Sequence, residues 1–347
     1  MKNTTYLILS IFLVLLIIFN VPAQAAMVKV GQTGAQFLKI DASARAVGMG
    51  SAYIMLGRDA SAVFYNPACL DLMEQKYDFF ANRTQWVADI SYYHMSLAGK
   101  LPNNMGTVAL SSIFADYGYI EGTLPVAKSI NPKGYIETGD IDCGSYAFGL
   151  TYSKQINSKF TIGGQLKYIG QNLGWTYDEK ESSGNGTVLN DDKINNSFGF
   201  AYDFGTIYYP GWKSFRFGMS IRNFSQEFDF DVGYPGSEEN EGRYELPLTF
   251  IMGAAIDLMD FVKISNQSLI LAIDAIHPRD YTERMHIGAE YWYNDKVALR
   301  GGYKFNYDEE SITFGGGIKI MGVKVDYAYS ALKTFDSVNR FSIGYSF

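Results

Sequence analysis

The most constraining feature of this sequence is the alternation of apolar and polar residues at its C-terminal end. The apolar positions are Phe341, Ile343, Tyr345 and Phe347, and a polar or small residue stands between each pair of them. Strict alternation predicts a β-strand, because successive side chains on a strand point to opposite faces. One face of this strand is therefore apolar and the other is polar.

The same alternation recurs along most of the chain after residue 76. In the preceding segment, Val323 and Val325 alternate with Lys324 and Asp326. A soluble β-sandwich would also alternate, so the period alone does not choose between the two classes. The polar faces of these strands carry many charges, and aromatic residues gather at strand ends, as the interfacial girdles of a membrane barrel require. These two features favour the membrane class.

The segments that alternate are long enough to cross a bilayer. We predict about fourteen strands of roughly ten residues, the length that a tilted transmembrane strand needs. They span residues 77–85, 90–100, 105–116, 143–154, 159–171, 194–205, 212–222, 246–258, 266–276, 283–293, 296–305, 309–319, 322–331 and 338–347. Because lipid cannot hydrogen-bond a free strand edge, the strands must close into a ring. The predicted fold is an all-β, antiparallel outer-membrane β-barrel.

The connection lengths give an independent indication of orientation. Connections that follow even-numbered strands are short, whereas the long ones, 116–142, 172–193 and 223–245, follow odd-numbered strands. Barrels of this class have short periplasmic turns and long outer loops. We therefore expect both termini on the periplasmic side.

Composition agrees with this class and excludes others. The chain has 35 Gly, 26 Tyr and 24 Phe, and its net charge of −7 argues against a nucleic-acid partner, which would require a basic surface. No stretch after the N-terminus is long enough for a membrane helix. Cys69 and Cys143 could pair in an oxidising compartment, but we favour two unpaired, small apolar residues.

The first residues have the order of a secretory signal. Lys2 precedes an apolar run over residues 6–19, and Ala23 and Ala25 supply an A-x-A cleavage pattern. The alternative, a membrane anchor, needs a run of roughly 20 apolar residues. We expect a signal peptide over 1–25, an N-terminal segment over 26–76 and the barrel over 77–347.

The N-terminal segment does not alternate but carries a series of short motifs. They are Phe37-Leu38-Lys39-Ile40, Ala44-Arg45-Ala46-Val47-Gly48-Met49-Gly50, Asp59-Ala60-Ser61-Ala62 and Asn66-Pro67-Ala68. In this order after a signal peptide, they resemble the start of the PorV/PorQ family, which belongs with the FadL-like outer-membrane barrels. The sequence departs from that family's pattern at Arg58, where an acid is common, and at Cys69, where Gly is common.

The resemblance implies a fourteen-stranded barrel whose N-terminal segment folds inward as a hatch. The positions that match the family in this hatch are Arg45, Gly48, Gly50, Asp59, Asn66 and Pro67. FadL-like barrels pass hydrophobic compounds inward, whereas PorV serves the type IX secretion system by receiving secreted cargo. Two functions are therefore open: a part in type IX secretion, which we favour, and uptake of small hydrophobic molecules.

Individual residues have a functional and a plain structural interpretation. Arg45 could pair with Asp59 or with an acid of the lumen and hold the hatch, or it could be a solvated surface residue. Asn66-Pro67 is expected to cap a turn before the first strand rather than to touch a ligand.

The charges on the inward faces predict a polar lumen. They are Lys167, Asp203, Arg216, Arg222, Asp274, His286, Glu290, Arg300, Lys324, Asp326 and Arg340. An ion pathway is one interpretation of this set, but a barrel of this size fills its lumen with polar side chains in any case.

No motif predicts catalysis. His94, His277 and His286 lack metal-ligand spacing, and no phosphate loop or nucleophile elbow is present, so we expect no enzyme activity, no cofactor and no metal. The acids near 178–181 and 238–241 could bind divalent ions, although solvated loops are the simpler interpretation. The expected partners are outer-membrane lipid, the barrel-assembly machinery through the terminal Phe341, Ile343, Tyr345 and Phe347, and either secretion components with their cargo or a hydrophobic small molecule.

Overall fold

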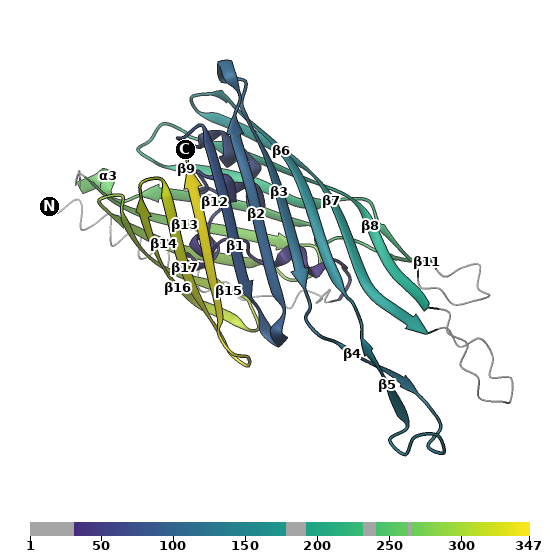
Figure 1. Cartoon of the computed structure of the whole chain (residues 1–347). Coiled ribbons are helices and arrows are strands. Elements are labelled where there is room, and N and C mark those ends of the chain that lie inside the picture. The colour runs from purple at the N-terminus through teal and green to yellow at the C-terminus, as the bar shows by residue number, and fades with distance from the viewer. Residues whose placement is uncertain (1–30, 178–191, 232–240, 263–265) are drawn as a thin grey trace.

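The computed structural model describes residues 31–177, 192–231, 241–262 and 266–347, and its centre is a closed barrel of fourteen antiparallel strands (Figure 1). In chain order the barrel strands are β1 (Tyr77–Gln85), β2 (Ser91–Lys100), β3 (Thr107–Asp116), β6 (Gly144–Asn157), β7 (Phe160–Tyr177), β8 (Asp192–Tyr208), β9 (Arg216–Phe224), β12 (Thr249–Asp257), β13 (Gln267–Pro278), β14 (Arg284–Tyr293), β15 (Val297–Phe305), β16 (Glu310–Ile320), β17 (Val323–Leu332) and β18 (Val338–Ser346). The predicted fold class and strand number are confirmed.

The first and last strands close the ring. β1 pairs with β18 from Asp78 opposite Ser346 to Gln85 opposite Asn339. At the seam, Tyr77 and Phe347 exchange two backbone hydrogen bonds of 2.9 Å. Closure leaves no unpaired strand edge to face lipid, which is the condition for strands to cross a bilayer.

Alternation along each strand separates an apolar outer face from a polar inner face. Leu110 and Phe198 are more than 60% exposed on the outside, whereas Thr151 is fully buried inside. The terminal apolar residues Phe341, Ile343, Tyr345 and Phe347 also lie on the exposed face. The outer face can therefore contact acyl chains, while the inner face surrounds an enclosed space.

The two ends of the barrel differ in the length of their connections. Turns of two to a few residues, such as 294–296 and 321–322, join strands at one end, which we call the short-turn end. At the opposite, long-loop end, β7 runs six residues past the predicted end at 171, because a strand beyond the bilayer needs no apolar alternation, whereas β8 begins only two residues before the predicted 194. The connection from β3 to β6 also forms an unpredicted hairpin of β4 (Glu121–Pro125) and β5 (Tyr135–Asp140), which projects away from the barrel (Figure 1).

A second unpredicted hairpin packs inward at the long-loop end. It consists of β10 (Phe228–Asp231) and β11 (Glu241–Tyr244), and Phe228 is buried beside Gly199 of β8. Elsewhere the described parts of the connections contain only short helices, namely η4 (Val87–Asp89), η5 (Pro102–Asn104) and α3 (Met259–Val262). Of the described residues, no helix is both long and apolar enough to span a membrane.

Residues 31–76, here called the N-terminal segment, lie against the inner face of the barrel. They contain η1 (Gln36–Lys39), α2 (Ala44–Gly48), η2 (Ala60–Phe64) and η3 (Pro67–Leu72), and most of their side chains are buried. Irregular backbone at membrane depth is tolerated only where protein surrounds it. The barrel supplies that surrounding.

The N-terminal segment runs through the barrel from one end to the other. Thr33 forms a bridge with Glu245 and a 2.5 Å hydrogen bond with Asp280, both in connections of the long-loop end. The segment finishes at the short-turn end, where β1 begins beside the C-terminus. The described part therefore begins at the long-loop end, while the N-terminus, which the sequence predicts to lie on the same side as the C-terminus, is outside the described residues. The predicted signal peptide, 1–25, lies outside the described residues.

Candidate functional site: the lumen around the N-terminal segment

Polar side chains of the barrel wall bond the backbone of the N-terminal segment. The Asp274 carboxylate accepts hydrogen bonds from the backbone N–H groups of Tyr53 (2.8 Å) and Ile54 (3.2 Å). Equivalent bonds join Thr313 to Gly50 N, Ser342 to Ala44 N, Asp78 to Ala60 N, Arg216 to Met55 O, Ser96 to Ala60 O, Ser220 to Tyr65 O and Ser153 to Ala68 O. Buried backbone groups must be paired, and the short turns of the segment pair only some of its own. The inward polar residues therefore do more than fill space.

Glycines on the wall let the segment approach the strands directly. A Cβ at Gly302 would lie 1.9 Å from the backbone N of Gly50, and one at Gly163 would lie 2.5 Å from the backbone N of Ala68. Gly163 is paired with Gly205 and Gly288 with Gly302, so bare positions adjoin across neighbouring strands. Of the predicted hatch glycines, Gly50 adopts a φ of +63° and Gly48 packs on Gly315. Only residues without side chains allow this separation.

Arg45 enters a buried ion-pair network that spans three barrel strands. Its Nε and Nη2 donate to the two oxygens of Glu290 at 2.8 and 2.7 Å. Arg300 Nε donates to the same Glu290 at 2.7 Å and its Nη1 to Asp326 at 2.7 Å. Arg45 Nη1 also lies 3.8 Å from Asp59. The structure therefore brings Arg45 to both acids considered from the sequence, with the bidentate pair to Glu290, whose geometry suits a guanidinium best.

Asp59 adds a second link between the segment and the wall. Lys324 Nζ lies 3.4 Å from Asp59 and 3.3 Å from Asp78. Burial alone would raise the pKa of Asp59, but the charges of Lys324 and Arg45 outweigh it and lower that pKa. The carboxylate therefore stays ionised at neutral pH and keeps both cations engaged.

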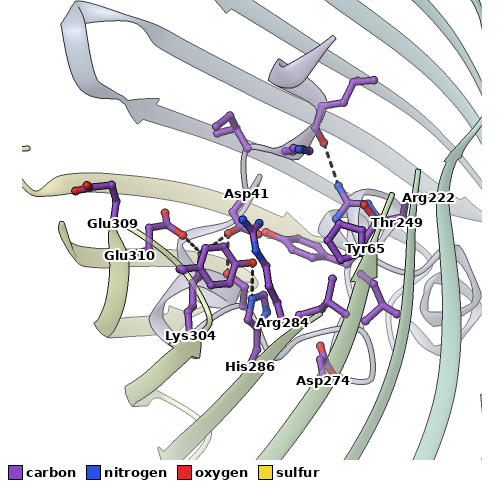
Figure 2. A pocket seen from close by; sticks show the side chains of 18 of the residues that line it. Asp41, Tyr65, Arg222, Thr249, Asp274, Arg284, His286, Lys304, Glu309 and Glu310 are labelled. Carbon is purple, nitrogen blue, oxygen red and sulfur yellow. Dashed lines mark hydrogen bonds and ion pairs between the residues drawn. The ribbon is translucent and has the colours of Figure 1, made fainter. Parts of the chain in front are cut away.

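A separate ion-pair group on the segment was not predicted. Lys304 Nζ lies 3.0 Å from Asp41 and 2.5 Å from Glu310 (Figure 2). Burial would raise the pKa of Asp41, but Lys304, Arg340 and the Ser51 hydroxyl bring it well below its usual value. Lys304 and Glu310 stand at inward positions of β15 and β16. The alternation along these strands could therefore have assigned both charged residues to the lumen. Asp41 lies among irregular residues and offered none.

The other predicted lumen residues all lie on the inner face. Lys167 pairs with Asp203 at 2.7 Å, Arg222 donates to the Leu38 carbonyl at 3.3 Å, His286 contacts the Tyr307 hydroxyl at 2.8 Å, and Arg340 donates to Ser330 at 2.9 Å.

Asn66 caps η3 by accepting from Ala68 N, with Pro67 at the first position of that helix. Cys69 and Cys143 are both free, and burial raises the pKa of the Cys69 thiol to about 12.

Two cavities lie on opposite sides of the N-terminal segment. The long-loop cavity, of about 400 Å³, is bounded by Asp41 and Ser51 from the segment and by Trp86 and Tyr307 from long-loop connections. The short-turn cavity, of about 420 Å³, is bounded by Arg45 and Asp59 from the segment and by inward residues of β14 to β18. The two share no lining residue. The segment is thus the partition between them.

These features define a class of protein: an outer-membrane β-barrel of fourteen strands whose lumen is occupied by its own N-terminal segment. The chain belongs to the family described as type IX secretion system membrane protein PorP/SprF, which matches residues 133–347. The motifs at residues 37–68 that resemble PorV/PorQ precede the matched range.

Solved structures agree with the fold. A Pseudomonas aeruginosa FadL homologue has a TM-score of 0.52 at 11% identity, covering 88% of this chain and 98% of that protein. The Pseudomonas putida toluene transporter TodX has a TM-score of 0.53 at 15% identity, with coverage of 88% and 98%. At these identities the likeness concerns the fold alone. No curated protein matches the chain.

Proposed function

We propose that this protein assists type IX secretion by binding secreted cargo or secretion components at the outer membrane, without catalysis. The observation that carries the proposal is the match of residues 133–347 to the PorP/SprF family. The ordered N-terminal segment supports a binding role over conduction, because it separates two cavities that share no lining residue. The motifs at residues 37–68 favour a PorV/PorQ-type member, and the exposed apolar face of β18 suits recognition by the barrel-assembly machinery.

The test compares secreted proteins in a deletion strain with those of the same strain carrying the wild-type chain. We expect the deletion to remove a set of proteins that share a C-terminal domain from the medium and the cell surface. Purification of the tagged barrel should recover members of that set. An unchanged set of secreted proteins in the deletion strain would reject the proposal.

A variant without the β4–β5 hairpin would localise the binding surface. The hairpin strands pair only with each other among the described strands, so replacing residues 121–140 with a short linker should leave the barrel closed. If cargo binds the projecting side of the barrel, this variant should assemble normally but recover less cargo than wild type.

The second candidate is uptake of a small hydrophobic molecule. The observation that favours it is the apolar part of the long-loop cavity, which includes Ile54, Ile251 and Ile276. Uptake of labelled hydrophobic compounds should then fall in the deletion strain while secretion stays unchanged, the reverse of the result expected for the first proposal.

A further inference from the structure

The connections at the short-turn end are not all alike. Several are turns of two or three residues, but those after β8 and β12 are longer and bond to each other. Ser214 N donates to the Asp260 carboxylate at 2.8 Å, and Lys213 Nζ donates to the Asp260 carbonyl at 3.1 Å. We call residues 209–215 and α3 together the aromatic corner. It lies at the end of the barrel opposite the β4–β5 hairpin (Figure 1).

The aromatic corner presents its rings to the outside. Trp212 is 57% exposed and Phe261 is 45% exposed, and their rings meet edge to face with centres 5.8 Å apart. Phe215 lies 6.0 Å from Trp212 on the other side. Two positions further on, Phe217 is an exposed outward residue of β9. The corner therefore continues the apolar outer face of the barrel, and aromatic residues at such a boundary lie at the level of lipid head groups.

Bases outnumber acids in the aromatic corner and the adjoining β6–β7 turn. Residues 154–160, 208–217 and 256–262 contain four bases and two acids, namely Lys154, Lys159, Lys213, Arg216, Asp257 and Asp260. Arg216 and Asp257 line the short-turn cavity and so belong to the lumen, and Asp260 is bonded by Ser214 N. Among the described residues, no ion pair joins Lys159 or Lys213 to an acid. The outward charge of the corner is therefore positive.

The two lysines approach the same place from different turns. The Lys159 carbonyl accepts from Tyr209 N at 2.8 Å, and its side chain passes Gly211, where an added Cβ would lie 3.9 Å from Lys159 Cε. Lys213 follows two positions later, with Nζ 5.6 Å from the centre of the Phe261 ring. Both lysines are exposed. An ammonium group has three donors, so each lysine keeps donors for an incoming acceptor.

We propose that the aromatic corner binds an anionic phospholipid, with the phosphate accepting from Lys159 and Lys213 and the acyl chains against Trp212 and Phe217. Short turns of outer-membrane barrels face the periplasm, so the lipid belongs to the inner leaflet. Lysines beside a membrane surface attract anionic head groups, and the rings fix the depth of the corner. Continuity with the apolar outer face favours a lipid over a soluble acidic partner. The site lies outside the lumen and does not depend on the secretion role.

The test measures which lipid lies beside Trp212. The full chain is placed in phosphatidylcholine nanodiscs that contain a minor share of either phosphatidylglycerol or phosphatidylcholine brominated near the head-group end of its acyl chains. Bromine quenches nearby tryptophan fluorescence, and the part of the quenching that Trp212→Phe removes belongs to Trp212. Brominated phosphatidylglycerol should quench this part at an about tenfold lower share of lipid than brominated phosphatidylcholine. Equal quenching by the two lipids would overturn the proposal.

Variants assign the preference to the two lysines. Lys159→Gln and Lys213→Gln should each reduce it about fivefold. Lys296→Gln is the matched control and should keep the full preference, because Lys296 is also exposed at the short-turn end but stands outside the corner. Folding of each variant is checked by its mobility on unheated gels. An unchanged preference in the double variant of Lys159 and Lys213, or an equal loss in Lys296→Gln, would reject the site.

Discussion

The two cavities beside the N-terminal segment are similar in volume but differ in how some of their cations are held. In the short-turn cavity, Arg45 and Lys324 are neutralised by Glu290, Asp59 and Asp78. In the long-loop cavity, Arg222 and Arg284 lie against aromatic rings and have no acid partner among the described residues.

The difference has a consequence for stability. A buried cation with its acid in place holds two parts of the chain together, and removal of the acid is costly because the cation is left unpaired. A cation without an acid adds little to the stability of the free protein. Both sides therefore hold the segment, but Arg222 and Arg284 on the long-loop side take no part in an ion pair among the described residues.

The largest expected effect comes from breaking the paired side. Glu290→Leu leaves Arg45 and Arg300 without their shared acid and should destabilise the barrel by about 3–5 kcal/mol. The measurement is the urea concentration at which the fast-migrating folded band disappears on unheated gels. Arg284→Met should cost less than about 1 kcal/mol in the same assay, since it breaks no ion pair. A larger loss in Arg284→Met than in Glu290→Leu would reverse the comparison.

The next effect concerns the wall residue that holds the partition from the long-loop side. Asp274→Ala leaves the backbone N–H groups of Tyr53 and Ile54 without an acceptor and should cost about 3 kcal/mol. Asp274→Asn keeps an acceptor oxygen and should retain most of the stability. Equal midpoints of urea unfolding for Asp274→Ala and the wild type would mean that this contact does not hold the segment.

A smaller effect tests whether the N-terminal segment needs glycines on the inner face of the barrel. Gly163→Ala places a methyl 2.5 Å from the backbone of Ala68 and should cost about 1–3 kcal/mol by overpacking. The neighbouring Gly164→Ala is the control, because its Cβ would meet only ordinary contacts near 3.8 Å. The buried thiol of Cys69 reports the shift in a Cys143→Ser background. Maleimide labelling should accelerate in Gly163→Ala and stay slow in Gly164→Ala; identical rates would argue against a tight fit.

The smallest expected effect depends on pH at the start of the segment. Burial would raise the pKa of Asp280, but hydrogen bonds from Lys39 and Thr33 lower it overall. A lowered pKa means that the stabilisation is present above the unfolded value near pH 4 and is lost as the pH falls through the folded value. The wild type should exceed Asp280→Asn by under about 1 kcal/mol at pH 7 and by less at pH 3. A constant difference would show that ionisation of Asp280 is not involved.

The sequence predicted the barrel well because lipid imposes one simple rule on every strand. The period of two located β18 and β17 nearly to the residue, and the same parity assigned Glu290 and Arg300 to the lumen. The long end of β7 was missed because a strand outside the bilayer is free of that rule.

The contacts of the N-terminal segment could be predicted only in part. The alternation along β14 predicts that Glu290 points inward. It does not predict that Arg45, 245 positions away in the sequence, bonds to Glu290. Asp41 and the aromatic stack around Arg284 depend on how irregular chain folds inside the barrel, for which no periodic signal exists.

The position of β18 links closure of the ring to docking of the N-terminal segment. This strand forms the seam with β1, and its Ser342 also accepts from Ala44 N of the N-terminal segment. β18 therefore both closes the sheet and holds the N-terminal segment at Ala44. A change that loosens this strand acts on both contacts at once, so retention of the segment and integrity of the ring are coupled.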